Sequence, residues 1–260
     1  MRLTLYQVDA FTGKLFSGNP AAVCPLEQWL PVELMRNIAR ENNLSETAFV
    51  VPEGNDFWIR WFTPSVEVDL CGHATLASGH VYFHHRQFPG NEIRFHSRSG
   101  LLRVRRQNDL LTLDFPADPA TKIELFPELT AGFNIKPKEG YRGKTDFLLV
   151  YEDESQIADL APDFRAIAKV DARGVIVTAR GRSVDFVSRF FGPQSGVDED
   201  PVTGSAHTTL TPYWSTVLGK KELTAMQLSS RRGSLQCKYL GDRVEISGKA
   251  MTYLIGEIDV

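Results

Sequence analysis

The feature that most constrains this chain is an internal repeat whose period is about half of its 260 residues. Short groups of residues recur at nearly constant offsets: Arg36, Ile38 and Ala39 as Arg165, Ile167 and Ala168; Arg60, Phe62 and Pro64 as Arg189, Phe191 and Pro193; Gly72 and Ala74 as Gly204 and Ala206. A spacing of this size predicts two copies of one folding unit, and a cleft between two copies is a natural small-molecule site.

Length and repeat together predict two domains, residues 1–116 and 117–260, joined at the proline-containing stretch 115–120. The formal charge of −3 offers no strong field for nucleic acid or an anionic membrane. No segment resembles a signal peptide or a membrane span. The three cysteines are far apart and the six histidines lack companion ligands, so we expect a cytoplasmic protein with no metal.

The two halves show the same order of predicted elements. A helix should begin at Pro31 and its equivalent at Pro162, each with an apolar stripe. Hairpins are predicted over 47–62 and 174–191, because both segments are rich in β-branched and aromatic residues around a polar turn. Each half then enters a glycine turn that opens an apolar helix, and closes with another hairpin. We expect an α+β fold in which a curved antiparallel sheet surrounds a central helix.

Chemistry should lie where the halves differ. Glu46 precedes an apolar strand in the first half, and its counterpart 129 residues later is Val175. A carboxylate present in one copy alone is what a single acid/base group would look like. The alternative is a solvated glutamate at a strand start.

The two glycine turns, at Gly72 and Gly204, leave backbone N–H groups free at helix starts, where a carboxylate can bind. His73 and Ser205 follow these glycines, and Asp200 precedes the second turn. The alternative is that the glycines only form tight turns and Asp200 only caps its helix.

These residues lie in segments that together resemble the PhzF-like isomerase family of phenazine biosynthesis, within the diaminopimelate-epimerase-like fold. The matching segments span nearly the whole chain: Val8-Asp9-Ala10-Phe11-Thr12, Gly18-Asn19-Pro20-Ala21, Ser45-Glu46-Thr47-Ala48-Phe49, Phe62-Thr63-Pro64, Glu67-Val68, Cys71-Gly72-His73-Ala74-Thr75 and Glu199-Asp200-Pro201-Val202-Thr203-Gly204-Ser205-Ala206. The resemblance implies two pseudo-symmetric halves with the active site between them.

The resemblance also implies a cofactor-independent isomerase that moves a proton on a small carboxylic or amino-acid-derived substrate, and a homodimer. It assigns acid/base catalysis to Glu46, which has to be desolvated for this role. The expected catalytic residues are Glu46, Asp200 and His73, and the expected substrate-binding residues are Ser205, Gly72, Gly204, Cys71, Asn19 and Thr203.

Two other functions compete with this prediction. The first is a non-catalytic protein that binds small carboxylates or a protein partner, which an exposed Glu46 would favour. The second is a cysteine-dependent racemase, in which two opposed thiols exchange a proton. Cys71 stands where one thiol would be, but the second half offers Thr203 at the equivalent turn and no thiol.

Overall fold

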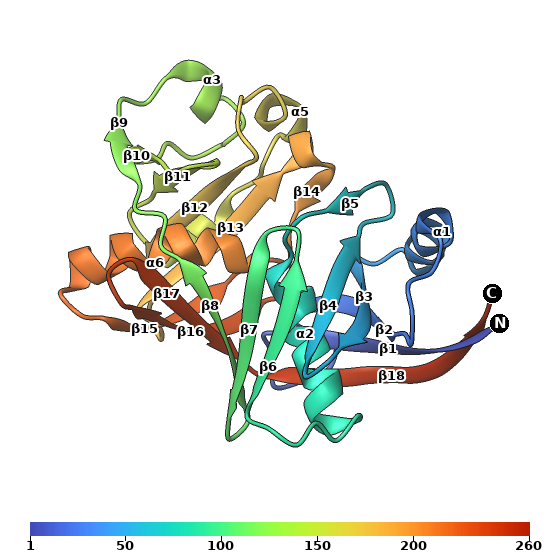
Figure 1. The fold of residues 1–260 in the computed structure, drawn as a ribbon. Coiled ribbons are helices and arrows are strands. Elements are labelled where there is room, and N and C mark those ends of the chain that lie inside the picture. Colours follow the sequence, from blue (N-terminus) through green and yellow to red (C-terminus); the bar gives the residue numbers. More distant parts are fainter. The chain divides into compact units, whose positions relative to one another are not determined.

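The computed structural model describes all 260 residues and divides into two compact units. The first unit is Met1–Asp114 with Ser247–Val260, and the second is Phe115–Ile246. The α+β class predicted from the sequence is confirmed, since strands dominate each unit and helices are few (Figure 1). No helix is long and apolar enough to cross a membrane.

The first unit is a curved, mostly antiparallel sheet with two helices. Its strands are β1 (Arg2–Ala10), β2 (Asn19–Pro25), β3 (Glu46–Glu53), β4 (Asp56–Phe62), β5 (Glu67–Val68), β6 (Glu92–Ser97), β7 (Gly100–Gln107), β8 (Leu110–Pro116) and β18 (Ala250–Asp259). Its helices are α1 (Val32–Asn42) and α2 (Gly72–His84).

The second unit has shorter strands and more short helices. Its strands are β9 (Thr121–Ile123), β10 (Glu139–Arg142), β11 (Asp146–Val150), β12 (Gly174–Arg180), β13 (Phe186–Gly192), β14 (Val197–Glu199), β15 (Glu222–Gln227), β16 (Gly233–Tyr239) and β17 (Arg243–Gly248). Its helices are α3 (Pro127–Thr130), α4 (Glu154–Asp159), α5 (Phe164–Ile167), the 3₁₀ turn Pro193–Ser195 and α6 (Gly204–Leu218).

Strand pairing repeats in the two units. In the first, β2 is parallel to β3, β3 antiparallel to β4, β4 parallel to β6, and β6 antiparallel to β7. In the second, β11, β12, β13, β15 and β16 pair in the same order and directions. An ion pair repeats with them, because Arg60 binds Glu67 through two nitrogens and Arg189 binds Glu199 in the same way. The repeat therefore extends from sequence to hydrogen bonding.

Each unit has one long buried helix. All residues of α2 from His73 to Phe83 are buried, and α6 buries most of its first three turns. A helix without a polar face has to be buried on all sides, because every face of it is apolar. The predicted central helices are therefore present in both units, each beginning at its glycine.

The helices predicted at Pro31 and Pro162 correspond less well. Pro31 stands just before α1, which buries Met35, Ile38 and Ala39 as expected. The second copy is instead divided into α4 and α5, because Pro162 lies between them and disfavours helical backbone before it. Within α5 only Ile167 is buried.

The last strand extends the first unit rather than the second. β18 pairs antiparallel with β1 from Arg2↔Asp259 to Ala10↔Ala250, so Ser247–Val260 is part of the first unit. β9 is its counterpart: it follows the last strand of the first repeat and pairs with β10 of the second unit. The boundary predicted at residue 116 assigns residues 247–260 to the second half. Pairing between the first and last strands of the chain leaves no local pattern in the sequence from which to predict otherwise.

Candidate active site

Glu46, His73, Cys71 and Asn19 form a buried polar cluster in the first unit. Nε2 of His73 lies 3.1 Å from Oε2 of Glu46, and the two side chains are 6% and 16% exposed. Nδ1 of His73 lies 3.2 Å from the amide nitrogen of Asn19 and 3.6 Å from Sγ of Cys71. The imidazole is thus contacted on both nitrogens.

The Glu46 and His73 atoms that face each other are close but not aligned for a hydrogen bond. Neither Oε2 of Glu46 nor Nε2 of His73 has another hydrogen-bond partner, although both atoms are buried. Buried polar atoms in folded proteins are almost always bonded, and exceptions concentrate at functional sites. This pair can therefore accept and donate hydrogen bonds to a bound ligand.

The pKa values of both His73 and Cys71 are raised in this cluster. Burial lowers the pKa of His73, but the neighbouring Cys71 and Glu46 outweigh burial, so this pKa is raised. Burial raises the pKa of Cys71 to about 11, and the charge of Glu46 adds to the effect. A protonated thiol is a poor nucleophile and a poor base.

The same three side chains could also act as metal ligands. The ligand atoms of Glu46, Cys71 and His73 lie within 4.8 Å of one another. Thiolate coordination requires loss of the thiol proton, which the raised pKa of Cys71 opposes.

In the second unit, the turn before α6 is held by Gln227. The amide oxygen of this fully buried side chain accepts a hydrogen bond from the Thr203 N–H at 2.8 Å, and its amide nitrogen donates to the Asp200 carbonyl at 2.7 Å. The Thr203 hydroxyl donates to Oδ2 of Asp200 at 2.5 Å. The positions of Asp200, Thr203 and Gly204 are therefore coupled.

Ser205 belongs to a second hydrogen-bonded group. Its hydroxyl oxygen accepts from Nη1 of Arg173 at 2.8 Å, and Arg173 in turn holds Asp146 through two nitrogens. The Asp146 side chain is only 2% exposed, so this ion pair is well shielded on the acidic side. Since the Ser205 oxygen already accepts, its proton remains available to donate to a ligand.

Both helix starts keep the backbone groups that an anion would need. α2 and α6 begin at Gly72 and Gly204, and neither preceding residue, Cys71 or Thr203, forms a side-chain hydrogen bond that caps its helix. His73 and Ser205 are the second residues of these helices, so their equivalence by repeat holds in the structure.

The residue opposite Glu46 in the repeat is Gly174, which corrects the pairing with Val175. Thr47 pairs with Phe62 and Val175 with Phe191, so these strands align one residue away from the sequence offset. A shift of one residue reverses the face on which a side chain lies. A Cβ at Gly174 would stand 2.3 Å from Cζ of Phe190, so the second copy has no room for a side chain there.

Sequence reasoning thus found the Glu46 cluster and the turn before α6, and missed Arg173, Asp146 and Gln227. Asp146 and Gly174 are opposite each other at the starts of β11 and β12, which brings Arg173 beside Asp146. No local sequence pattern predicts these contacts, because they depend on strand pairing.

Comparison with known proteins gives a consistent result. The sequence profile of the family described as phenazine biosynthesis-like protein matches residues 8–256. An uncharacterized isomerase of Pseudomonas aeruginosa is 54% identical over 259 residues, 99% of each chain. A crystal structure of a phenazine biosynthesis protein PhzF family member from Enterococcus faecalis has a TM-score of 0.98 and 47% identity over the full length of both chains. A predicted epimerase of P. aeruginosa shares the fold, with a TM-score of 0.78 at 19% identity over 99% of both chains.

Proposed function

Since this chain belongs to the phenazine biosynthesis-like (PhzC-PhzF) protein family, we propose that it is an isomerase that moves a proton on a small carboxylic or amino-acid-derived substrate. The observation that carries the proposal is the buried pair of Glu46 and His73, whose facing atoms are unbonded. A desolvated carboxylate beside an imidazole with a raised pKa is suited to general acid/base catalysis.

In the proposed reaction, the Glu46 carboxylate removes a proton from a substrate carbon, and the electron pair of the broken C–H bond moves into a neighbouring unsaturated group. The same carboxyl then returns the proton to another carbon, so the product is an isomer and no oxidant or cofactor is required.

We further propose that the starts of α2 and α6 contribute to substrate binding. The uncapped starts of α2 and α6 can each bind carboxylate oxygens, and Ser205 can donate its proton to the substrate. Asp200, fixed by Thr203 and Gln227, would orient the reacting part of the substrate.

The competing functions have less support. A simple binding protein does not need a buried Glu46 beside His73, and the limited exposure of Glu46 disfavours it. Exchange of a proton between two thiols requires a second cysteine. Cys237 is buried in β16 with its pKa raised to about 12, which opposes that role.

The decisive experiment incubates the protein in D₂O with a panel of small carboxylic and amino acids and follows substrate carbons by NMR. Wild-type protein should introduce deuterium at one substrate carbon. Glu46→Gln should reduce this exchange about 10³-fold, because an amide cannot carry the proton. Asp200→Ala should also abolish turnover, and Ser205→Ala should weaken it less.

Glu53→Gln is the matched control, because it removes an exposed carboxylate from the other end of the same strand. It should leave exchange unchanged. Full activity in a folded Glu46→Gln variant would remove Glu46 from the mechanism. Turnover in which the substrate hydrogen is neither exchanged with solvent nor transferred to another substrate carbon would exclude this isomerisation.

We also propose a homodimer that forms through β18, and a cytoplasmic location. β18 is paired on one edge only, and Met251, Tyr253, Leu254 and Ile255 are exposed along it. The segment from Ala250 to Gly256 contains no charge or proline to protect such an edge. The three unpaired cysteines are compatible with a reducing compartment.

A further inference from the structure

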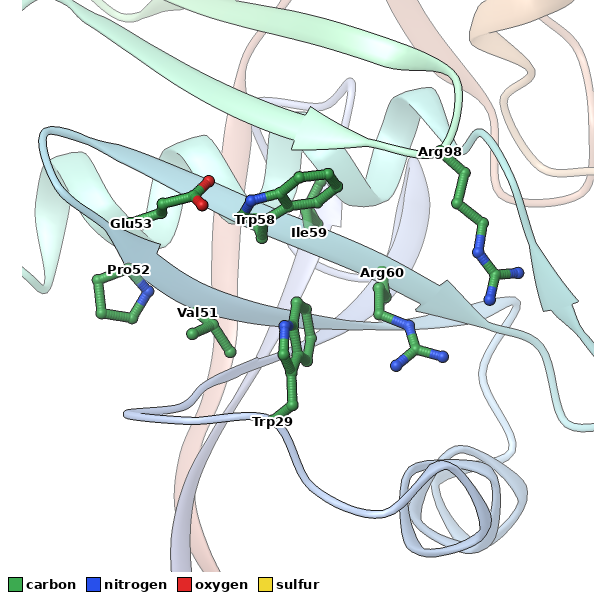
Figure 2. Close-up of a pocket in the computed structure, with 8 residues that line it drawn as sticks. All are labelled: Trp29, Val51, Pro52, Glu53, Trp58, Ile59, Arg60 and Arg98. Carbon is green, nitrogen blue, oxygen red and sulfur yellow. The ribbon is translucent and has the colours of Figure 1, made fainter.

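A cavity lies in the first unit and includes no residue of either polar cluster. It has a volume of 490 Å³ and lies over β3 and β4, where Val51 and Trp58 are cross-strand partners. Trp29, from the loop before α1, lines it as well (Figure 2). This volume is within the range of small-molecule sites, which are mainly apolar with a few polar groups.

One of the two arginines that line this cavity, Arg60, differs from its repeat equivalent Arg189 in one respect. Arg60 and Arg189 both bind a glutamate through Nε and Nη2. Nη1 of Arg189 also donates to the carbonyls of Ile157 and Leu160, at 3.2 and 2.8 Å. Nη1 of Arg60 has no such acceptor, and the guanidinium instead lies 5.4 Å from the Trp29 ring. In the second unit, backbone carbonyls accept hydrogen bonds from this arginine nitrogen. In the first unit, the equivalent arginine lines a cavity instead.

Charge at this end of the cavity favours an anion. Nη2 of Arg98 lies 3.0 Å from Oε2 of Glu67, so Arg60 and Arg98 share one carboxylate that is 8% exposed. The hydrogen bond from Arg60 outweighs burial and lowers the pKa of Glu67. The other acid near Arg98 is Asp69, at 3.6 Å and 70% exposed, where water screens it.

The opposite end of the cavity carries a negative charge. Figure 2 shows Glu53 at one end of the cavity and the guanidinium groups of Arg60 and Arg98 at the other. The exposed carboxylate of Glu53 disfavours a second negative group on a ligand that reaches it. The surfaces in between are the indoles of Trp29 and Trp58 and the side chain of Val51.

We infer that this cavity binds a small aromatic monocarboxylate. Its carboxylate bonds to Nη1 of Arg60 and to Arg98, and its ring lies against Trp29 and Trp58. Guanidinium groups match carboxylate oxygens in geometry, and indoles provide flat apolar surfaces for an aromatic ring. The site is independent of the proposed isomerase reaction.

The test uses protein labelled with ¹⁵N at tryptophan and follows the four indole N–H signals during titration with benzoate. The signals of Trp29 and Trp58, assigned with Trp29→Phe and Trp58→Phe, should shift and saturate. Those of the buried Trp61 and Trp214 serve as internal references. Benzylamine, which lacks the negative charge, should not bind, and cyclohexanecarboxylate should bind more weakly than benzoate.

Arg98→Gln should weaken benzoate binding about tenfold through loss of a charge-assisted hydrogen bond. Trp29→Ala should have a similar effect. Arg94→Gln is the matched control: Arg94 is comparably exposed and ion-paired with Asp56 but does not line the cavity, so affinity should not change.

Binding of benzoate that leaves the Trp29 and Trp58 signals in place would assign it to another site and overturn the inference. The inference also fails if no signal saturates, or if Arg98→Gln and Arg94→Gln bind equally well.

Discussion

At the scale of single residues, two buried histidines couple stability to pH. Burial, with smaller contributions from His84 and His85, lowers the pKa of His80 to about 3, and burial lowers that of His207 to about 4. In the unfolded chain both would titrate near 6.5, so the unfolded state binds more protons below that pH. Stability should fall as pH decreases from about 6.5, by about 2 kcal/mol per histidine at pH 5.

Urea unfolding at pH 7 and pH 5 measures this effect. His80→Gln should reduce the loss, whereas His84→Gln, at an exposed position of the same helix, should retain most of it. An equal loss in wild type and His80→Gln would contradict the assignment. His73 acts in the opposite sense: its raised pKa contributes stability below about 6.5 that is lost as pH rises through the folded value.

The residues of the site differ in how far sequence could predict them. Glu46, His73 and Asp200 each lie within a few residues of a turn that begins an element, so local patterns located them. Arg173 contacts Asp146 across 27 residues of sequence, and that contact depends on the pairing of β11 with β12. The one-residue error at Val175 has the same origin, since an offset taken from motifs does not determine strand register.

At the scale of elements, α2 approaches β7 so closely that glycine is required at one position. A Cβ at Gly79 would stand 2.6 Å from Cγ1 of Val104, which is fully buried. Gly79→Ala should therefore destabilise the fold by about 1–3 kcal/mol, although alanine favours a helix by about 1 kcal/mol. Chemical denaturation of the purified variant measures this difference.

Combining Gly79→Ala with Val104→Ala provides the control. Since the smaller side chain makes room for the new methyl group, the double variant should be more stable than the sum of the two single changes predicts. Simple additivity would show that the contact does not determine the cost. Gly54→Ala is not a suitable comparison, because its positive φ adds strain at a position with open space.

Central elements were more predictable than peripheral ones. The long apolar helices begin at glycine turns, the hairpins after them have alternating patterns around polar turns, and both occur where expected. The helix expected to begin at Pro162 begins instead at Phe164, and three shared residues could not show that Ile167 is its one buried residue. Its connection is fixed instead by Asp163, which accepts hydrogen bonds from two N–H groups of α5.

At the scale of the whole molecule, the edge strand predicts how copies associate. Ile255 is 56% exposed within the part of β18 that lacks charge and proline. Ile255→Lys should shift the protein from dimer to monomer, because a charge on a sheet edge opposes pairing with another edge. Analytical ultracentrifugation of wild type, Ile255→Lys and the control Val217→Lys, an exposed apolar residue on α6, gives the comparison. A wild-type monomer, or a dimer unaffected by Ile255→Lys, would exclude this interface.

The positions of β9 and β18 have a consequence for the origin of the chain. β18 follows the second repeat and pairs with β1 of the first unit, whereas β9 follows the first repeat and pairs with β10 of the second unit. In a single ancestral copy, the equivalent strand could pair with the first strand of its own copy or with that of a second copy. The present chain therefore has the connectivity of two fused copies that have exchanged their terminal strands. Expression of one repeat alone would leave its sheet without one strand.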